Sequence, residues 1–278
     1  MRYIFIVGCG RSGTHFLRNI LNKHSKIWIS GELHYFDRLI HRGVIKATKH
    51  LYPFNNEKKI DQLFELLQSG KMFSPFWENP NIQYKKIKKD FLKSQKTYKD
   101  LYRIVLDERA LSNNKIFGGE KTPLNIFHLK KIFRWFPEAK AIHIIRDPRA
   151  IFVSELHKKR NFKVPVNKIN FFYSIIIFFY VVIECAIAYR ISDSLKKRHT
   201  NNFFQVKYSD LVLEQELITK SICNFLNIDF ESNMLNTKNV NSSFEKGYDT
   251  VNGWKYKIPK IYNMLLTYIF KKRIFQNK

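Results

Sequence analysis

Short apolar runs recur along the chain, and each one ends in a turn or leads into a helical stretch. Residues 3–7 form the first run, which reaches a glycine-rich loop and then a helix expected from about residue 14 to residue 22. Further runs cover residues 26–30, 141–145 and 203–208. Ser209 and Asp210 follow the last run and are expected to cap a helix that begins near Leu211. Strands that alternate with helices predict an α/β fold, a parallel sheet with helices on both faces, in which ligands lie at the carboxyl ends of the strands.

Two stretches depart from this alternation. Residues 84–99 hold seven lysines and one acid, while Ile87, Phe91 and Leu92 are spaced as one helical face. We interpret this stretch as a solvated basic face, with an anionic acceptor track as the alternative. Residues 169–189 carry a single charge, Glu184, and their length would suffice to span a bilayer. A buried or interface helix is the favoured interpretation, and a membrane segment is the alternative.

The composition is that of a folded domain with an unusual charge. The chain has 278 residues, 45% of them hydrophobic and 15% aromatic, which fits one domain over residues 1–278 with a basic tail at about 256–278. Lysine and arginine number 49 against 23 acids, and the net charge of +26 favours anionic partners. Cys9, Cys185 and Cys223 are too scattered for a disulfide framework or a zinc cluster, so they indicate a reducing compartment. The first apolar run is too short for an export signal, and a cytoplasmic protein is expected, with membrane association left open.

The loop after the first apolar run has the residues of an anion-binding site. Residues 8–15 read Gly-Cys-Gly-Arg-Ser-Gly-Thr-His, and backbone N–H groups at the start of a helix bind phosphate. Gly8, Gly10 and Gly13 fit a dinucleotide fingerprint, for which Glu32 would be the ribose-binding acid. The loop then predicts an NAD-dependent oxidoreductase as one function.

The same loop is also compatible with phosphosulfate binding, but it does not fit a Walker A nucleotide site. A Walker A loop requires a lysine at the position of Thr14, which argues against a kinase or ATPase. Alternatively, Arg11, Ser12 and Thr14 are side-chain donors to a phosphosulfate group, with Arg11 as a cation fixed within the turn.

A second strand, turn and helix start separates these alternatives. Residues 143–154 read His-Ile-Ile-Arg-Asp-Pro-Arg-Ala-Ile-Phe-Val-Ser, and Pro148 suits the first turn of a helix. Arg146 stands at the carboxyl end of its strand, where the ligand of the first loop is expected. Ser154 follows eight residues later, close enough for both side chains to reach one phosphate. An oxidoreductase has no evident use for this pair.

These motifs resemble the PAPS-dependent sulfotransferase superfamily, most closely its protein-tyrosine and glycan branch. Residues 11–14 are similar to the family's 5′-phosphosulfate loop, which also implies a cofactor contact at His15, where the family often has Thr or Ser. Arg146 and Ser154 are similar to its 3′-phosphate motif. The resemblance covers about residues 1–258 and implies a P-loop-like parallel sheet, the sulfotransferase fold. It also implies PAPS as co-substrate, PAP as product and no metal.

Further residues take roles through the same resemblance. Gly118-Gly119-Glu120-Lys121-Thr122-Pro123 resembles the lysine-bearing segment of the family, in which Lys121 would stabilise charge on the transferring sulfonate. Arg11 would be the second catalytic cation. Glu32 resembles the general base for the acceptor hydroxyl, and His34 is an alternative base. Tyr208 resembles the tyrosine beside the nucleotide. Ser243 and Lys255 resemble residues of a loop that folds over the cofactor.

The acceptor is specified only by its chemistry. The basic residues favour an acidic glycan or peptide, or a lipid-linked saccharide at an anionic membrane surface, and Ile261, Met264, Leu265, Tyr268 and Ile269 give the tail an apolar helical face. That face is expected either to dock on the body of the protein or to contact a membrane. No nucleic-acid recognition module accompanies the charge, so nucleic acid is not an expected partner. His143, inside an apolar strand, is expected to be a core residue.

Overall fold

The structure is a computed structural model that describes residues 2–36, 43–69, 76–77, 79–157, 171–237 and 249–272. These residues fall into two compact units. Unit 1 comprises Met1–Val7 and Arg18–Ile142, and unit 2 comprises Gly8–Leu17 and His143–Lys278. This division into compact units does not test the prediction of one domain over the whole chain, which stays a prediction.

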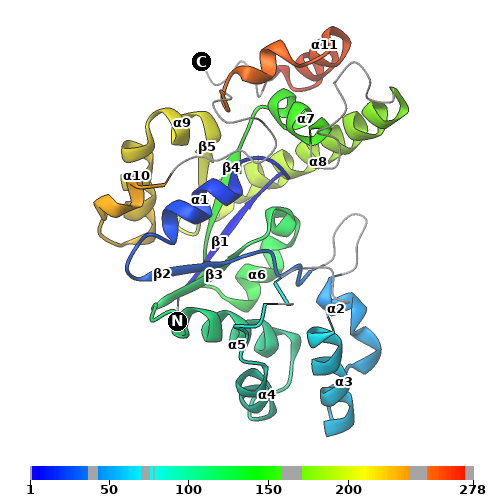
Figure 1. The fold of residues 1–278 in the computed structure, drawn as a ribbon, viewed down its shortest axis with the longest axis vertical. Coiled ribbons are helices and arrows are strands. Elements are labelled where there is room, and N and C mark those ends of the chain that lie inside the picture. The colour runs from blue at the N-terminus through cyan, green and yellow to red at the C-terminus, as the bar shows by residue number, and fades with distance from the viewer. Residues whose placement is uncertain are drawn as a thin grey trace. The chain divides into compact units, whose positions relative to one another are not determined.

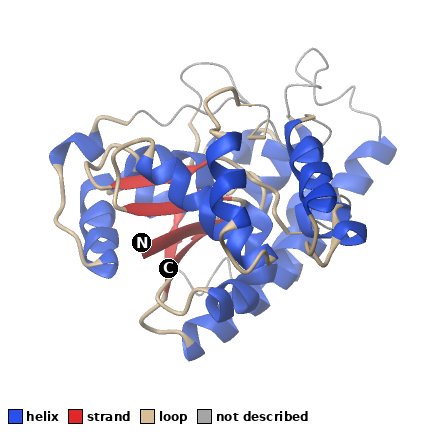
Figure 2. Ribbon diagram, turned by 90° about the horizontal axis from the view of Figure 1, so that it is seen from below, coloured by secondary structure: helices blue, strands red, loops and turns tan. Residues whose placement is uncertain are grey.

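Five strands form one sheet in the order β2-β3-β1-β4-β5. The strands are β1 (Arg2–Gly8), β2 (Ile27–Ser30), β3 (Phe117–Lys121), β4 (Lys140–Ile145) and β5 (Phe203–Lys207). β3 pairs in parallel with both β1 and β2, and Figure 1 shows these three strands side by side. Figure 2 shows strands and helices together, so the predicted α/β fold with a parallel sheet is confirmed.

Four of the strands coincide with the four apolar runs, but the sequence did not predict β3 as a strand. Its residues, Phe-Gly-Gly-Glu-Lys, have low β-propensity because two of the five are glycine. A side chain at Gly119 would collide with the carbonyl group of Ile4 on β1, so only glycine permits the parallel pairing at this point. At Gly119, close packing against β1 therefore outweighs the low β-propensity of glycine.

Unit 1 is a helical layer around a cluster of aromatic residues. Its helices are α2 (Val44–Ala47), α3 (Glu57–Gln68), α4 (Tyr84–Leu92), α5 (Tyr98–Leu111) and α6 (Leu129–Trp135), with the C-terminal part of α1 (Thr14–Leu21). The ring of Tyr102 stacks on that of Tyr35, with centroids 4.4 Å apart, and contacts Phe36 and Trp135. On α4, Ile87 and Phe91 are buried while Leu92 is exposed, so the predicted apolar face of this basic helix is narrower than expected.

Unit 2 contains α7 (Pro148–Leu156), α8 (Phe171–Arg198), α9 (Tyr208–Leu213), α10 (Gln215–Leu226) and α11 (Lys260–Ile269). α7 packs against both α8 and α11, and Figure 1 shows the three together. α9 begins at Tyr208, and its N-cap, Lys207, makes no side-chain cap hydrogen bond. The expected capping by Ser209 and Asp210 was therefore wrong, because both already lie inside the helix, where the Ser209 hydroxyl donates to the Asp210 carboxylate.

α8 is the stretch for which a buried helix and a membrane segment were both considered. Its 28 residues are long and apolar enough to cross a bilayer by length and composition alone, and 33% of its most apolar 18-residue window is buried. Glu184, Cys185 and Tyr189 lie on its buried side. The helix is thus packed on one side within unit 2 and exposed on the other.

Candidate functional site

The loop between β1 and α1 is the first part of the site, and it lies in unit 2. Arg11 and Gly13 both have left-handed backbone conformations, with φ of 61° and 102°. A side chain at Gly13 would overlap the ring of Tyr208, so glycine is required there both by conformation and by space. The turn brings Arg11, Ser12 and Thr14 into succession at the N-terminus of α1.

Ser12 is the residue of this loop that best fits a bound anion. Its side chain is fully buried, and its hydroxyl has no hydrogen-bond partner in the protein. A buried hydroxyl without a partner costs free energy, and a phosphate or sulfonate oxygen would satisfy it. The loop at the start of α1 also offers backbone N–H groups and the positive end of the helix dipole. The residues present therefore fit the 5′-phosphosulfate part of PAPS.

Arg146, directly after β4, joins this loop from the other side of unit 2. Its Nη1 atom donates to the carbonyl oxygen of Arg11 over 2.8 Å, and Nη2 donates to the carbonyl oxygen of Thr250 over 2.7 Å. The guanidinium group also lies 4.3 Å from the ring centroid of Tyr208. Arg146 is thus fixed at the point where the sequence placed it, in contact with the loop and with Tyr208.

Ser154 is the second residue of the predicted 3′-phosphate motif, and it also contacts the loop. Arg11 Nε donates to Ser154 Oγ over 3.1 Å, and Ser154 is buried on α7. α7 begins with Pro148 at its first turn, as predicted, and the Asp147 side chain caps it by accepting from the backbone N–H of Arg149. Arg11, Arg146, Ser154 and Tyr208, which are far apart in the sequence, therefore form one cluster.

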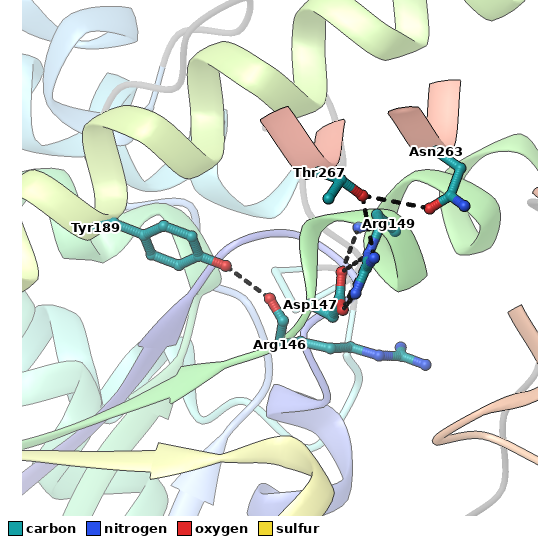
Figure 3. Close-up of polar contacts among 6 residues, drawn as sticks. All are labelled: Arg146, Asp147, Arg149, Tyr189, Asn263 and Thr267. Carbon is teal, nitrogen blue, oxygen red and sulfur yellow. Dashed lines mark hydrogen bonds and ion pairs between the residues drawn. The ribbon is translucent and has the colours of Figure 1, made fainter. Parts of the chain in front are cut away.

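Arg149 supports the end of this cluster, a role that the sequence did not reveal. Its side chain forms an ion pair with Asp147, with Nη2 and Oδ2 2.6 Å apart, and donates to the hydroxyl of Thr267 on α11. It also lies 4.5 Å from the ring centroid of Trp254. Figure 3 shows that the Arg149 side chain points away from that of Arg146, whose carbonyl oxygen accepts from the Tyr189 hydroxyl over 2.6 Å.

Glu184 is a further residue that the sequence did not place at the site. Its carboxylate accepts a hydrogen bond from the backbone N–H of Gly10 in the loop, and the side chain is 1% exposed. The available signal was its position as the single charge in a long apolar stretch, because a buried charge requires a partner. Glu184 therefore holds the backbone of the candidate nucleotide loop from α8.

The other predicted cofactor residues are His15, Lys255, Thr14 and Ser243. His15 is exposed on the first turn of α1, and Lys255 is exposed in the short helix Gly253–Tyr256. Thr14 is buried at the start of α1. Ser243 lies outside the described residues. Contacts of these four residues with PAPS stay predictions.

Unit 1 holds the second part of the site, an ion pair at the carboxyl ends of β2 and β3. Lys121 Nζ lies 2.5 Å from Glu32 Oε1, and His34 Nε2 lies 3.3 Å from Glu32 Oε2. The side chain of Glu32 is 32% exposed, whereas Lys121 and His34 are buried. The predicted base, the alternative base and the predicted cation therefore form one group, in which Glu32 is the member open to a substrate.

Burial affects the ionisation of the groups around this pair. Burial lowers the pKa of Lys121, and the carboxylate of Glu32 opposes that shift. Burial raises the pKa of the neighbouring Glu120 to about 7. Glu120 Oε1 accepts from the side-chain amide of Asn125 over 2.5 Å. Glu120 is fully buried behind the site, whereas Glu32 is partly exposed.

A pocket of about 450 Å³ opens beside Glu32 within unit 1. Its lining residues come from α1, β2, the segment after β2, residues 76–79 and α5: Arg18, Asn22, Trp28, Ile29, Ser30, Gly31, Glu32, His34, Phe76, Asn79 and Arg109. This volume suits a small ligand. The pocket is a candidate acceptor site because the predicted base forms part of its wall.

Two other sequence expectations concern histidines and metals. His143 is fully buried and its Nδ1 atom is 2.6 Å from Ser192 Oγ, which confirms it as a hydrogen-bonded core residue. Within the described part of the chain, no group of three or more His, Cys, Asp or Glu side chains is arranged to hold a metal ion.

Comparison with protein families decides between the two functions that the loop allowed. The family model described as "Sulfotransferase family" matches residues 3–232. The chain belongs to the sulfotransferase family. The dinucleotide interpretation of Gly8, Gly10, Gly13 and Glu32 is thereby excluded as the family assignment, and Glu32 is the partner of Lys121 and His34.

Solved structures support the fold of this sulfotransferase. The sulfotransferase domain of the Synechococcus PCC 7002 olefin synthase is 18% identical with a TM-score of 0.58, covering 98% of this chain and 94% of that domain. The sulfotransferase domain from the curacin biosynthetic pathway is 16% identical with a TM-score of 0.56, covering 97% of both chains. Mouse sulfotransferase SULT7A1, complexed with PAP, is 14% identical with a TM-score of 0.50, covering 99% of this chain and 84% of that one. No curated protein sequence matches this sulfotransferase.

Proposed function

We propose that this sulfotransferase moves the sulfonate group of PAPS to a hydroxyl group of an acceptor and releases PAP. The observation that carries the proposal is the cluster in unit 2, where Arg146 donates to the Arg11 carbonyl and Arg11 donates to Ser154 beside the unpartnered hydroxyl of Ser12. The PAP complex of the similar mouse enzyme is consistent with a nucleotide at such a cluster.

The residues of unit 2 would bind and orient the nucleotide. Ser12, Thr14 and the loop amides would hold the 5′-phosphosulfate, while Arg146 and Ser154 would hold the 3′-phosphate. Tyr208 offers its ring to the nucleotide, as the resemblance implies. PAPS supplies an activated sulfonate, whose sulfur–oxygen bond to the 5′-phosphate breaks as the bond to the acceptor oxygen forms.

The residues of unit 1 would handle the proton and part of the charge. Glu32 accepts the proton of the acceptor hydroxyl, for which an ionised carboxylate open to the pocket is suited. Lys121 holds the Glu32 carboxylate and provides a cation for the negative charge that spreads in the transition state. His34 contacts the second carboxylate oxygen and orients it.

The nucleotide part of the proposal is tested by ligand-induced thermal stabilisation. PAP should raise the melting temperature well above 5′-AMP, ATP or NAD at equal concentration, because a ligand of the native state stabilises it by mass action. Stabilisation by NAD without an effect of PAP would overturn the proposal.

The proton acceptor is tested with Glu32→Gln and His34→Gln. Glu32→Gln should lower kcat by about 10²–10⁴-fold, the usual contribution of a positioned base, and leave stabilisation by PAP unchanged. His34→Gln should lower kcat less. The opposite order of effects would make His34 the base.

A further inference from the structure

The pocket beside Glu32 contains polar atoms that the protein itself leaves without partners. Arg18 Nε, Trp28 Nε1, Ser30 Oγ and Arg109 Nε are all buried and make no hydrogen bond with the protein. All four residues line the same pocket. Buried polar groups are paired in the great majority of cases, so four unpaired ones around one pocket indicate a site completed by a bound molecule.

Three of these four atoms can only donate a hydrogen bond. The guanidinium Nε–H groups of Arg18 and Arg109 and the indole N–H of Trp28 are donors without acceptor capacity. Arg109 also donates from Nη1 to the carbonyl oxygen of Asn81 over 2.9 Å, which fixes its orientation. A molecule that completes this site must therefore bring oxygen acceptors.

The charges around the pocket indicate which kind of hydrogen-bond acceptor the bound molecule brings. Arg18 and Arg109 are cations of the wall, and the one carboxylate of the described lining, Glu32, already contacts Lys121 and His34. Burial lowers the pKa of Arg18, which reflects its loss of hydration. The Glu32 carboxylate opposes this shift, but Glu32 also pairs with Lys121. A neutral ligand would therefore leave an excess of positive charge at the wall, whereas an anionic oxygen group would pair with the guanidinium groups of Arg18 and Arg109.

The shape of the wall adds an apolar component. Trp28 and Phe76 contribute aromatic side chains to the lining, and such rings bind the flat apolar face of a sugar or an aromatic group.

We propose that this pocket selects an acceptor that carries a carboxylate or phosphate group in addition to the hydroxyl to be sulfonated, with Arg18 and Arg109 as the anion-binding residues. The inference rests on the proposed function, because it takes Glu32 as the base at the reacting hydroxyl. The anionic group of the acceptor then lies on the guanidinium groups while its hydroxyl lies at Glu32.

The test compares ligands that differ only in the anionic group. p-Nitrophenyl β-D-glucuronide and p-nitrophenyl β-D-glucoside share the aromatic group and ring hydroxyls, but only the first carries a carboxylate. In the presence of PAP, calorimetric titration should give the glucuronide roughly tenfold higher affinity than the glucoside, the contribution of one charged hydrogen bond. Glucose 6-phosphate against glucose distinguishes a phosphate from a carboxylate as the preferred anion.

The variant Arg18→Gln should remove the preference and leave glucoside binding unchanged. Arg134→Gln is the matched control, because Arg134 is exposed on α6 and outside the pocket. If PAP stabilises the protein but neither anionic ligand is preferred over its neutral counterpart, this inference is wrong and the proposed function stands. If PAP fails to stabilise the protein at all, the proposed function fails first.

A second, independent observation concerns the outer surface of unit 2. α11 has two apolar faces, and the inner one packs through Tyr262, whose hydroxyl is 2.6 Å from Ser174 Oγ and whose ring contacts Phe152 and Phe178. Leu266 and Phe270 are buried on the same side. The outer face consists of exposed residues: Ile261, Met264, Leu265, Tyr268 and Ile269. The expectation that these five residues dock on the body of the protein was therefore wrong, because the opposite face of the helix makes that contact.

α8 presents a similar outer stripe. Its exposed apolar residues recur every three or four positions: Phe172, Ile176, Phe179, Ile183 and Ile187. This spacing places them on one side of the helix, opposite the buried side. α11 packs on Ser174 and Phe178 at the buried side of α8, so this stripe and the exposed face of α11 lie on different sides of the pair. We define the outer apolar surface as the five exposed residues of α11.

Basic residues flank the outer apolar surface. Residues 250–272, which include this surface, contain five lysines and no acid. A second copy of the chain would bring a like-charged surface, since each copy carries a net charge of +26, and Coulomb repulsion opposes that contact. A partner surface that is both apolar and anionic would complement the exposed apolar side chains and the lysines of this region.

We propose that the outer apolar surface contacts an anionic lipid bilayer at its interface. The apolar side chains enter the acyl boundary, lysines pair with anionic headgroups, and the exposed Tyr256 and Tyr268 are suited to the headgroup level. The buried side of α8 stays packed in unit 2, so the contact is peripheral.

The test is co-sedimentation of the full chain with vesicles. Binding is expected to vesicles of equal parts phosphatidylcholine and phosphatidylglycerol and not to phosphatidylcholine alone. Met264→Gln with Tyr268→Gln should weaken binding by roughly tenfold per side chain, and Lys271→Gln with Lys272→Gln by roughly fivefold per charge. Leu213→Gln with Leu217→Gln, exposed elsewhere in unit 2, and Lys85→Gln with Lys86→Gln, exposed on α4, are the matched controls.

The outcome separates a membrane from a protein partner. Stabilisation by PAP should be equal in all variants, which shows that each one folds. Absence of binding to the anionic vesicles overturns the proposal. A dimer in light scattering that Met264→Gln with Tyr268→Gln dissociates, without vesicle binding, would assign the surface to a second copy instead.

Discussion

Arg146 Nη1 donates a hydrogen bond to the main-chain carbonyl oxygen of Arg11 over 2.8 Å. The same guanidinium group donates to the carbonyl oxygen of Thr250 and lies over the ring of Tyr208. One side chain at the end of β4 therefore joins the nucleotide loop, the segment before the C-terminal helix and the start of α9.

Replacement of Arg146 should affect binding and stability together. Arg146→Ala is expected to abolish stabilisation by PAP and to lower the free energy of unfolding by about 2–4 kcal/mol, because two carbonyl groups lose a charged donor. Thermal and urea unfolding with and without PAP measure both effects. Arg190→Ala, at an exposed position on α8, is the control and should change neither. Full stabilisation of Arg146→Ala by PAP would show that the 3′-phosphate is bound elsewhere.

Glu184 should act on PAP binding through the loop backbone. Glu184→Gln keeps an acceptor for the Gly10 N–H and should retain PAP affinity, whereas Glu184→Ala should weaken it by roughly tenfold. Titration calorimetry with PAP measures the difference. Glu216→Ala, in an exposed ion pair with Lys220, serves as the control. Equal affinity of all three variants would limit Glu184 to a role in folding.

Lys121 is expected to contribute to catalysis more than to nucleotide binding. Lys121→Met should lower kcat by about 10²–10³-fold, since a cation at the transferring group stabilises the transition state. Its carboxylate partner, Glu32, is partly exposed and remains hydrated in the variant. Stabilisation by PAP should be unchanged, because PAP lacks the transferring group. Loss of PAP binding with unchanged kcat at saturation would instead make Lys121 a nucleotide ligand.

Glu120 predicts a pH dependence of stability. Its pKa is about 7 in the folded protein against 4.5 as the ordinary value, so the folded state binds the extra proton between these two pH values. Stability from this group is present below pH 4.5 and is lost as the pH rises toward 7. The loss is about 3 kcal/mol at most. Glu120→Gln should remove this slope, so the variant should gain stability relative to the natural protein between pH 5 and pH 8 in urea unfolding. An unchanged difference between the two proteins at both pH values would contradict this assignment.

The sequence predicted the parts of the fold that depend on local pattern. The four apolar runs became β1, β2, β4 and β5, and Pro148 marked the start of α7. β3 was missed because Gly119 is required for close contact with β1, and propensity carries no information about a neighbouring strand. The predicted cap at Ser209 and Asp210 was wrong because the helix begins at Tyr208, three residues before the expected start near Leu211.

The candidate site was predictable where motifs are contiguous and unpredictable where partners are distant. Residues 11–14 and Arg146 with Ser154 were found from short motifs, and the structure brings Arg11, Arg146 and Ser154 into one cluster. Glu184 and the unpartnered donors of the pocket were not found, because their significance depends on burial and on residues far along the chain. Arg18 and Arg109, for example, lie on different helices and are related only by the pocket that they line.

α8 contacts Gly10 through Glu184 and the carbonyl oxygen of Arg146 through Tyr189, and it also packs against the inner face of α11. A helix with contacts of both kinds couples two binding equilibria whenever a ligand on one side changes its order. Thermodynamic linkage then requires that the factor by which a bilayer changes PAP affinity equals the factor by which PAP changes bilayer affinity. Co-sedimentation with and without PAP would therefore measure how strongly nucleotide binding inside unit 2 is coupled to bilayer binding at its outer surface.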